Sequence, residues 1–224
     1  VFGGTSGIGL ATINMLQAQG AAVVAISRSP DKAGDLPGVE LVACDVRDEQ
    51  ALAALFAAQA PYDVLISAAT GGERAAGPFL QMDLAGYRGS FDKLWGYTNV
   101  VRLGTENLSA DGNIVLVSGA PARRPKPGQA AIASVGGAVE QFVRAVAPEL
   151  APKRINVVSP GVIDTPMFGN DADARAKMLA GATAKNLIPR AGTPEEVAAG
   201  IMFVVQNDFV TGTTIDVDGG WVHA

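Results

Sequence analysis

Hydrophobic and polar positions alternate along this chain in blocks rather than residue by residue. Short runs rich in Val, Ile and Leu recur throughout the sequence, and glycine or polar turn residues bound each run. Nearly continuous apolar runs of this kind are typical of strands covered on both faces, as in a parallel sheet. We therefore expect strands at Ala22–Ile26, Val39–Ala43, Val64–Ser67, Asn113–Ser118, Ile155–Ser159 and Thr214–Val217.

The longer stretches between these runs are amphipathic and favour helices. Thr193 precedes Pro194, and Glu195 and Glu196 follow, which combines an N-cap, a first-turn proline and first-turn acids. Strands alternating with helices predict one α/β domain over residues 1–224, a doubly wound parallel sheet of about seven strands with helices on both faces. Helices are expected at Gly7–Gln19, Glu49–Gln59, Leu84–Leu108, Gln129–Leu150 and Pro194–Val205.

The chain opens on a cluster of glycines where a strand would meet a helix, and we expect further residues of that strand before Val1. The spacing Gly-x-x-x-Gly-x-Gly is typical of a dinucleotide phosphate loop, in which free N–H groups at the helix start face the phosphates. Glycine-rich turns are common, so the motif alone is weak evidence. The candidate cofactor-binding residues of this loop are Gly3, Thr5, Ser6, Gly7, Ile8 and Gly9.

The segment from residue 164 to 190 breaks the alternation, being polar, rich in alanine and helical only in part. A long insertion after the carboxyl end of a strand is a natural substrate lid. We therefore predict a lid at about residues 164–190. Met167 and Leu179 are expected on an apolar wall of the pocket, although packing alone would also place apolar residues there.

Composition excludes several classes of function. The net charge of −5 argues against nucleic acid as the main partner. Cys44 is the single cysteine and His223 the single histidine, so an internal disulfide, a multi-cysteine metal site and a Ser-His-Asp hydrolase are excluded, and no metal is expected. We see no stretch that reads as a membrane span or signal peptide, and expect a cytoplasmic protein without membrane partners.

Several segments, in order, resemble the short-chain dehydrogenase/reductase family. That resemblance implies a Rossmann fold and an oxidoreductase that transfers a hydride between a nicotinamide cofactor and a carbonyl or alcohol. The segments that carry it, after the glycine loop, are Cys44-Asp45-Val46, Asp111–Val115 with Ser118, Arg154–Met167, Val210–Gly212 and Asp216–Gly220.

The resemblance also assigns cofactor contacts. It implies that Asp45 and Val46 meet the adenine. The second strand ends Ser27-Arg28-Ser29, without the acid that would bind a ribose 2′-hydroxyl, and an arginine fork suits a 2′-phosphate, so we expect NADP. The family's Asn-Ala-Gly segment is altered here, and its nicotinamide segment is retained. These two segments supply the remaining candidates: Ser67, Ala68, Ala69, Pro160, Gly161, Val162, Ile163 and Thr165.

The family's catalytic Tyr-x-x-x-Lys pair is absent. The tyrosine normally follows the serine by thirteen residues, and counting from Ser118 gives Ala131, with Val135 in place of the lysine. A lysine, Lys93, stands where the family places an asparagine on the fourth helix. We therefore predict a rebuilt site in which Ser118 holds the substrate oxygen and Lys93 replaces the lost proton donor, with Tyr97 four residues on as a possible assistant.

Two other functions stay open from the sequence. One is a catalytically silent NADP(H)-binding protein, a sensor or a structural subunit. The other is an isomerase or double-bond reductase, which would have no use for the tyrosine. The intact nicotinamide segment, lid and Ser118 favour the oxidoreductase with a small-molecule substrate. Relatives often pair their long fourth and fifth helices between subunits, so we expect a homo-oligomer, a dimer or tetramer.

Overall fold

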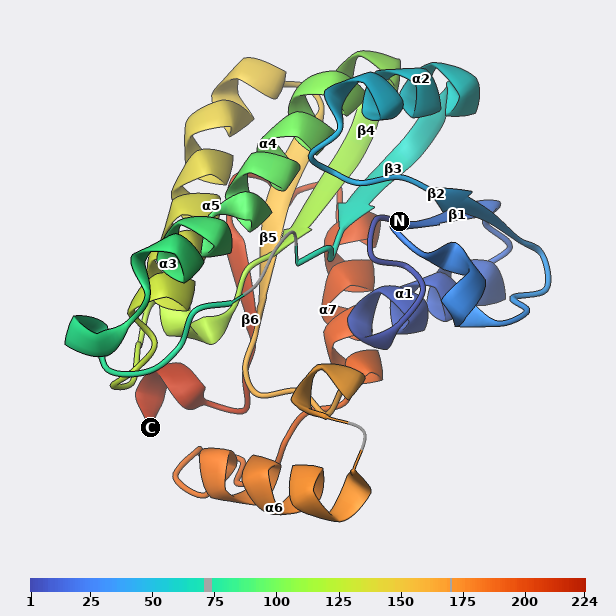
Figure 1. The fold of residues 1–224 in the computed structure, drawn as a ribbon. Helices are drawn as coiled ribbons and strands as arrows, with labels where there is room; N and C mark the ends of the chain where they lie inside the picture. The colour runs from blue at the N-terminus through green and yellow to red at the C-terminus, as the bar shows by residue number, and fades with distance from the viewer. Residues whose placement is uncertain (71–73, 170) are drawn as a thin grey trace.

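The computed structural model describes residues 1–70, 74–169 and 171–224, and these residues form a layered α/β structure (Figure 1). Phe2 pairs in parallel with Ile26 and with Ser67, and so joins a two-stranded and a four-stranded part in the order β2-β1-Phe2-β3-β4-β5-β6. The parallel strands are β1 (Val23–Ser27), β2 (Val39–Ala43), β3 (Tyr62–Ser67), β4 (Leu108–Val117), β5 (Arg154–Pro160) and β6 (Thr214–Val217).

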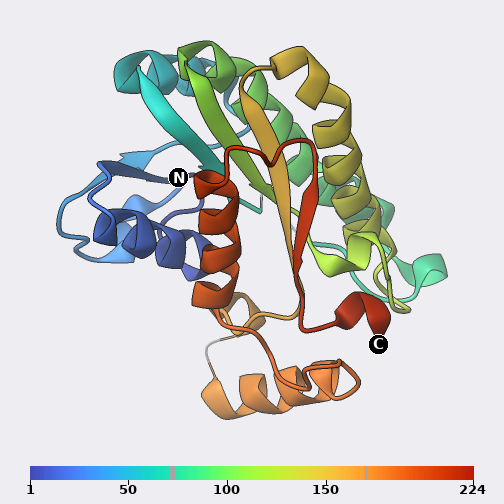
Figure 2. The same ribbon diagram turned by 180° about the vertical axis from the view of Figure 1, so that it is seen from behind.

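Helices cover both faces of this sheet. Helices α2, α4 and α5 lie on one face, and α1 and α7 lie on the other (Figures 1 and 2). The strand order reverses beside Phe2, which creates a switch point where a ligand crevice forms at the carboxyl ends of the strands. The helices are α1 (Gly7–Ala18), α2 (Glu49–Gln59), α3 (Leu84–Ser90), α4 (Asp92–Gly104), α5 (Ala130–Leu150), α6 (Ala172–Thr183) and α7 (Pro194–Gln206).

The core divides between the two faces of β4. Ile114 and Leu116 pack into the cluster that contains Val139 of α5, whereas Val115 packs into the cluster that contains Ile201 of α7. Successive side chains of a strand point to opposite faces, so a strand buried on both sides must be apolar at every position. This confirms the predicted α/β class and explains why its strands read as continuous apolar runs.

One predicted helix, Leu84–Leu108, is wrong as a single element. The chain forms α3, bends at Phe91, continues as α4 and ends in a 3-10 turn before β4 begins at Leu108. Asp83 caps α3 through the N–H of Gly86, while the Phe91 N–H bonds back to Arg88 instead of continuing the α-helical pattern. The remaining predicted helices and strands agree with the structure to within a few residues, apart from β4, which begins five residues earlier than the predicted strand.

Helix α5 also corrects the expectation that no stretch is apolar enough to span a bilayer. It is 21 residues long, with a mean hydropathy of 1.2 over its best window. The helix packs against β5 and α4, and its Val139 and Val143 are fully buried. A third of that window is buried inside the protein. A helix that packs one face into a core can have this composition as well, so length and composition alone are weak evidence for a span.

Candidate functional site

A cleft of about 820 Å³ lies at the switch point, along the carboxyl ends of the strands. Its walls come from the glycine loop, the ends of β1, β3, β4 and β5, the first turns of α4 and α5, and the segment after β5. The structure brings Lys93, Ser118 and every candidate cofactor-binding residue except Ser67 into this one cleft. Leu179, expected on the pocket wall, is buried in α6 and does not line it. Ser67 is fully buried at the end of β3, and its hydroxyl has no hydrogen-bond partner among the residues that the structure describes.

The glycine loop is shaped by close backbone packing. Gly3 has φ of +74°, a left-handed conformation that favours glycine. A Cβ on Gly9 would collide with the carbonyl group of Gly3, so α1 lies directly against the loop. The start of α1 has neither a side-chain cap nor an acid in its first turn. Its N–H groups are thus left for an anion, which fits the pyrophosphate of a dinucleotide.

The end of the cleft beside β1 is basic. Arg28 and Lys32 line it and are exposed, and Ser27 accepts a hydrogen bond from the Ser29 N–H at 3.1 Å. Asp45 also lines this end, but Arg47 binds its carboxylate and lowers its pKa. Among the lining residues that the structure describes, no carboxylate stands free to repel a 2′-phosphate. These residues therefore fit NADP.

Lys93 lies in the first turn of α4 with its ammonium group in the cleft wall. The Nζ atom donates to the carbonyl oxygen of Ser118 at 3.2 Å and lies 5.5 Å from the ring centroid of Tyr97. Burial, and then the nearby charge of Arg74, lower the pKa of Lys93 to about 7. An amine with such a pKa exchanges its proton near neutral pH, as a general acid or base must.

Tyr97 does not reach the reacting space. It is 1% exposed, it is absent from the cleft wall, and its hydroxyl donates to the carbonyl of Val117 at 3.0 Å. Burial raises its pKa. The suggestion from the sequence that Tyr97 assists Lys93 is therefore not supported, because its polar atom is already used in packing α4 against β4.

Ser118 lies in the cleft wall just after β4, with its hydroxyl turned to α5. Its Oγ donates to Oε1 of Glu140 at 3.1 Å, and that carboxylate is only 2% exposed. Arg123 and Arg144 lie 3.7 and 3.5 Å from the two oxygens of Glu140. The buried carboxylate is thus balanced by two arginines, and it holds the Ser118 side chain in one orientation.

The residues of α5 that line the cleft correct the position that is assigned to the family's tyrosine by counting from Ser118. Ala131 is fully buried and does not line the cleft, whereas Ile132, Val135 and Gly136 do. Ile132 and Gly136 are four residues apart on one helical face, which is the spacing of a Tyr-x-x-x-Lys pair that faces a ligand. Thirteen residues before Ile132 is Gly119, which also lines the cleft. The expectation that Ala131 replaces the tyrosine is therefore wrong by one residue.

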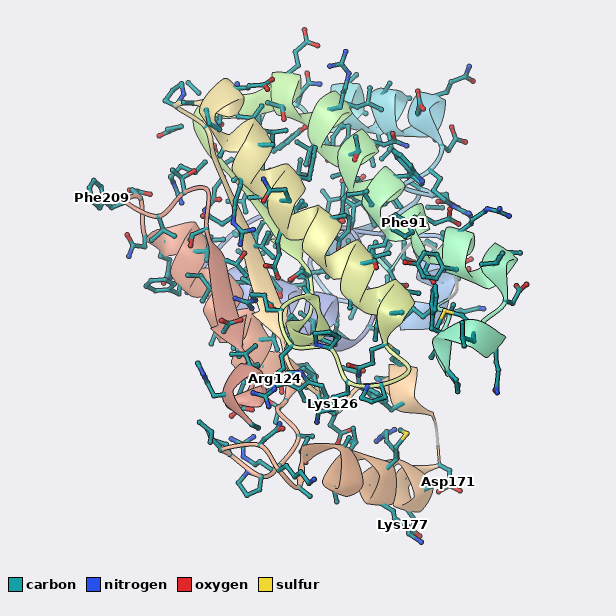
Figure 3. The ribbon with its side chains drawn as sticks, turned by 90° about the vertical axis from the view of Figure 1, so that its left-hand side faces the viewer. Phe91, Arg124, Lys126, Asp171, Lys177 and Phe209 are labelled. Atoms are coloured by element: carbon teal, nitrogen blue, oxygen red, sulfur yellow. The ribbon has the colours of Figure 1, made fainter. Side chains whose placement is uncertain are left out.

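The predicted lid contributes both an edge and an outer wall. Pro166, Met167 and Phe168 form a 3-10 turn that lines the cleft, and α6 contributes Ala182. Lys126, in the loop before α5, donates to the carbonyl of Ala182 at 3.4 Å; Figure 3 shows this loop facing α6. Residues 166–168 and Ala182 thus border the cleft, and the role of segment 164–190 as a lid stays a prediction.

Sequence reasoning missed several lining residues. Gln129 and Gly136 could have been found from their helical spacing with Ile132. No periodic pattern surrounds the others, which only the fold brings to the cleft: Lys32, Thr70, Arg74, Ser90, Ala182 and Trp221.

Known proteins resemble this chain along its length. L-xylulose reductase of Bos taurus is 30% identical over 234 residues, covering 99% of this chain and 95% of that protein. The structure of a small-chain dehydrogenase in complex with NADPH matches with a TM-score of 0.85 at 29% identity, covering 100% of this chain and 97% of that one.

Another similar structure is a short chain oxidoreductase from Pseudomonas aeruginosa PAO1 described as containing an atypical catalytic center. It has a TM-score of 0.85 at 26% identity, covering 100% of this chain and 96% of that one. The family model described as enoyl-(acyl carrier protein) reductase matches residues 3–222. The chain belongs to the short-chain dehydrogenase/reductase family of oxidoreductases.

Proposed function

We propose that this protein is an NADP(H)-dependent oxidoreductase that interconverts a carbonyl and an alcohol through a rebuilt proton-transfer site. The observation that carries the proposal is the position of Lys93. Its amine lies in the same cleft as the glycine loop and contacts Ser118, and the described residues of α5 that line this cleft are Ile132, Val135 and Gly136, none of which can transfer a proton. The cleft thus has one side chain suited to proton transfer where the family uses a tyrosine.

In this proposal NADPH, when bound, supplies the hydride, and side chains of the protein handle the proton. Lys93 donates a proton from Nζ to the oxygen of the substrate during reduction, and accepts it back during oxidation. The bond from Nζ to the Ser118 carbonyl orients the amine in the cleft.

Preference for NADP over NAD rests on Arg28 and Lys32. Both line the β1 end of the cleft, where an acid would select NAD and a guanidinium selects a 2′-phosphate. The similar dehydrogenase in complex with NADPH supports the same choice. Met167, Phe168 and Ile132 on the substrate side support a substrate with an apolar body.

The proposed function is tested by following label from the cofactor. The protein is mixed with NADPH deuterated at C4 and with a panel of aldehydes and ketones, and mass spectrometry measures deuterium in the alcohol. Transfer of the label is expected. Tight NADPH binding without transfer to any member would contradict the oxidoreductase and favour the silent binding protein.

Arg28→Ala should weaken NADPH binding by roughly 10- to 100-fold, since one charge-assisted contact to the 2′-phosphate is lost. NADH affinity should stay unchanged, because NADH has no phosphate there. Titration of cofactor fluorescence measures both dissociation constants. Arg102→Ala, at an exposed position of α4, is the matched control. An equal loss for NADPH and NADH would contradict the assignment of Arg28 to the phosphate.

We further propose that the protein is cytoplasmic and a homo-oligomer. Exposed apolar side chains near the start of α3 and on α4 support an interface there, namely Phe79, Leu80, Leu84 and Trp95. Helices α4 and α5 lie side by side (Figure 1). Exposed large apolar side chains are typical of a subunit contact when they gather on one surface.

A further inference from the structure

Arg74 is a second cation in the substrate half of the cleft. It follows β3 along the chain, lines the cleft, and donates from Nη1 to Sδ of Met167 at 3.1 Å. Lys93 lines the same cleft and contacts the carbonyl of Ser118. The charge of Arg74 lowers the pKa of Lys93, as expected for two cations of one cleft.

Neither cation has an acidic partner among residues 1–70, 74–169 and 171–224. The ion pairs of this part of the chain do not include Arg74 or Lys93. A thioether sulfur is a weak, neutral acceptor for a guanidinium. Arg74 is an exposed residue of the cleft wall, and partial desolvation of its guanidinium lowers its pKa. A guanidinium that is open to the cleft can bind an anionic group of a ligand.

The cleft is basic although the chain is acidic. The described lining residues include Arg28, Lys32, Arg74 and Lys93 but a single carboxylate, Asp45, which Arg47 already binds. The chain as a whole carries a net charge of −5. Arg28 and Lys32 are accounted for by the cofactor phosphate at the β1 end. Arg74 and Lys93 lie at the substrate end, where the cofactor phosphate does not account for them.

We propose that Arg74 and Lys93 form an anion site, and that the substrate is a carbonyl compound carrying a carboxylate group. This deepens the proposed function and rests on it. The planar fork of Arg74 matches the two oxygens of a carboxylate. Lys93 lines the same cleft and supplies a second positive charge there. The apolar side chains of Met167 and Ile132 enclose the rest of the molecule. Arg74 is thus a specificity-determining residue, and its charge selects for acids over their neutral esters.

The test compares para-carboxybenzaldehyde with its methyl ester as substrates, with NADPH. The wild-type protein should reduce the acid with a kcat/KM roughly 10- to 100-fold higher, the difference made by one charge-assisted pair. Arg74→Gln should remove this preference and Arg74→Lys should keep part of it. NADPH affinity should be unchanged in both. Arg88→Gln, a nearby arginine on α3 outside the cleft wall, is the control.

A second measurement does not depend on turnover. Calorimetry of the NADP⁺ complex should show benzoate binding more tightly than benzamide in the wild type and equally weakly in Arg74→Gln. Benzoate binding no better than benzamide overturns the anion site. Reduction of both aldehydes without preference overturns this inference and keeps the proposed function. Arg74-dependent benzoate binding without any hydride transfer keeps the anion site and overturns the proposed function.

Discussion

Lys93→Met should lower kcat for carbonyl reduction by roughly 10²- to 10⁴-fold, the contribution of a positioned general acid. Methionine keeps the length and bulk of the buried side chain but has no proton to give. Because the substitution also removes a buried amine that is costly to ionise, the thermal unfolding midpoint should stay near that of the wild type. NADPH binding should persist. Steady-state kinetics and thermal denaturation measure the two effects separately.

The pH dependence of kcat/KM tests whether Lys93 acts as the acid in reduction. A general acid works only when protonated, and the pKa of Lys93 is about 7. The kcat/KM for reduction should therefore level off below about pH 7 and fall about tenfold per unit above it, with the descending limb missing in Lys93→Met. Oxidation of the alcohol should show the opposite dependence.

Lys93→Arg separates charge from proton transfer. Arginine keeps the positive charge but does not release a proton in proteins, so activity should stay low if Lys93 acts as an acid. Lys153→Met, a position outside the cleft wall, is the matched control. Full activity in Lys93→Arg would assign only an electrostatic role to Lys93, and full activity in Lys93→Met would remove it from the mechanism.

Gly9→Ala should destabilise the protein by roughly 3 kcal/mol or more, at the upper end for overpacking, and should abolish NADPH binding. The added Cβ would overlap the carbonyl group of Gly3 and approach Cα of Gly4. These are backbone atoms, which cannot rotate away as a side chain can. The start of α1 would have to lift from the loop, and its N–H groups would lose their aim at the phosphates. Urea unfolding and cofactor fluorescence measure the two losses.

Gly89→Ala provides the control for Gly9→Ala. Gly89 lies within α3 and nothing comes within 4 Å of a Cβ built there. Alanine in a helix is favoured over glycine by roughly 0.5–1 kcal/mol, so this variant should be as stable as the wild type or more so, with full NADPH affinity. A Gly9→Ala protein that unfolds at the wild-type urea concentration would show that the loop packs more loosely than described.

The sequence predicts a residue's place in the cleft where a local motif, formed by its neighbours in the chain, determines its position. The glycine loop and the segment around Pro160 and Gly161 are local motifs, and both reach the cleft as expected. Arg74 is different. It comes after the end of β3 in the chain, and only the pairing of β3 with its neighbours and the return of Met167 bring it to the substrate end. Long-range packing of this kind leaves no local pattern.

The misassigned register at Ala131 has a different cause. The spacing of thirteen residues holds between Gly119 and Ile132, so the count from Ser118 is wrong because it starts one residue too early. On a helix, one residue turns the side chain by about 100° around the axis. Ala131 therefore faces the core while Ile132 faces the cleft. The break at Phe91 was missed because apolar spacing continues across it.

The contact of Lys126 with the lid has a consequence for observing this protein in solution. The Lys126 ammonium lies 3.4 Å from the centre of the Trp221 ring, and the Trp221 indole N–H donates to the Arg124 carbonyl. Lys126 also holds Ala182 of α6. Withdrawal of α6 therefore changes the charge and solvent beside one indole. Trp221 emission would serve as a built-in reporter of opening, read directly in the native chain without any attached dye.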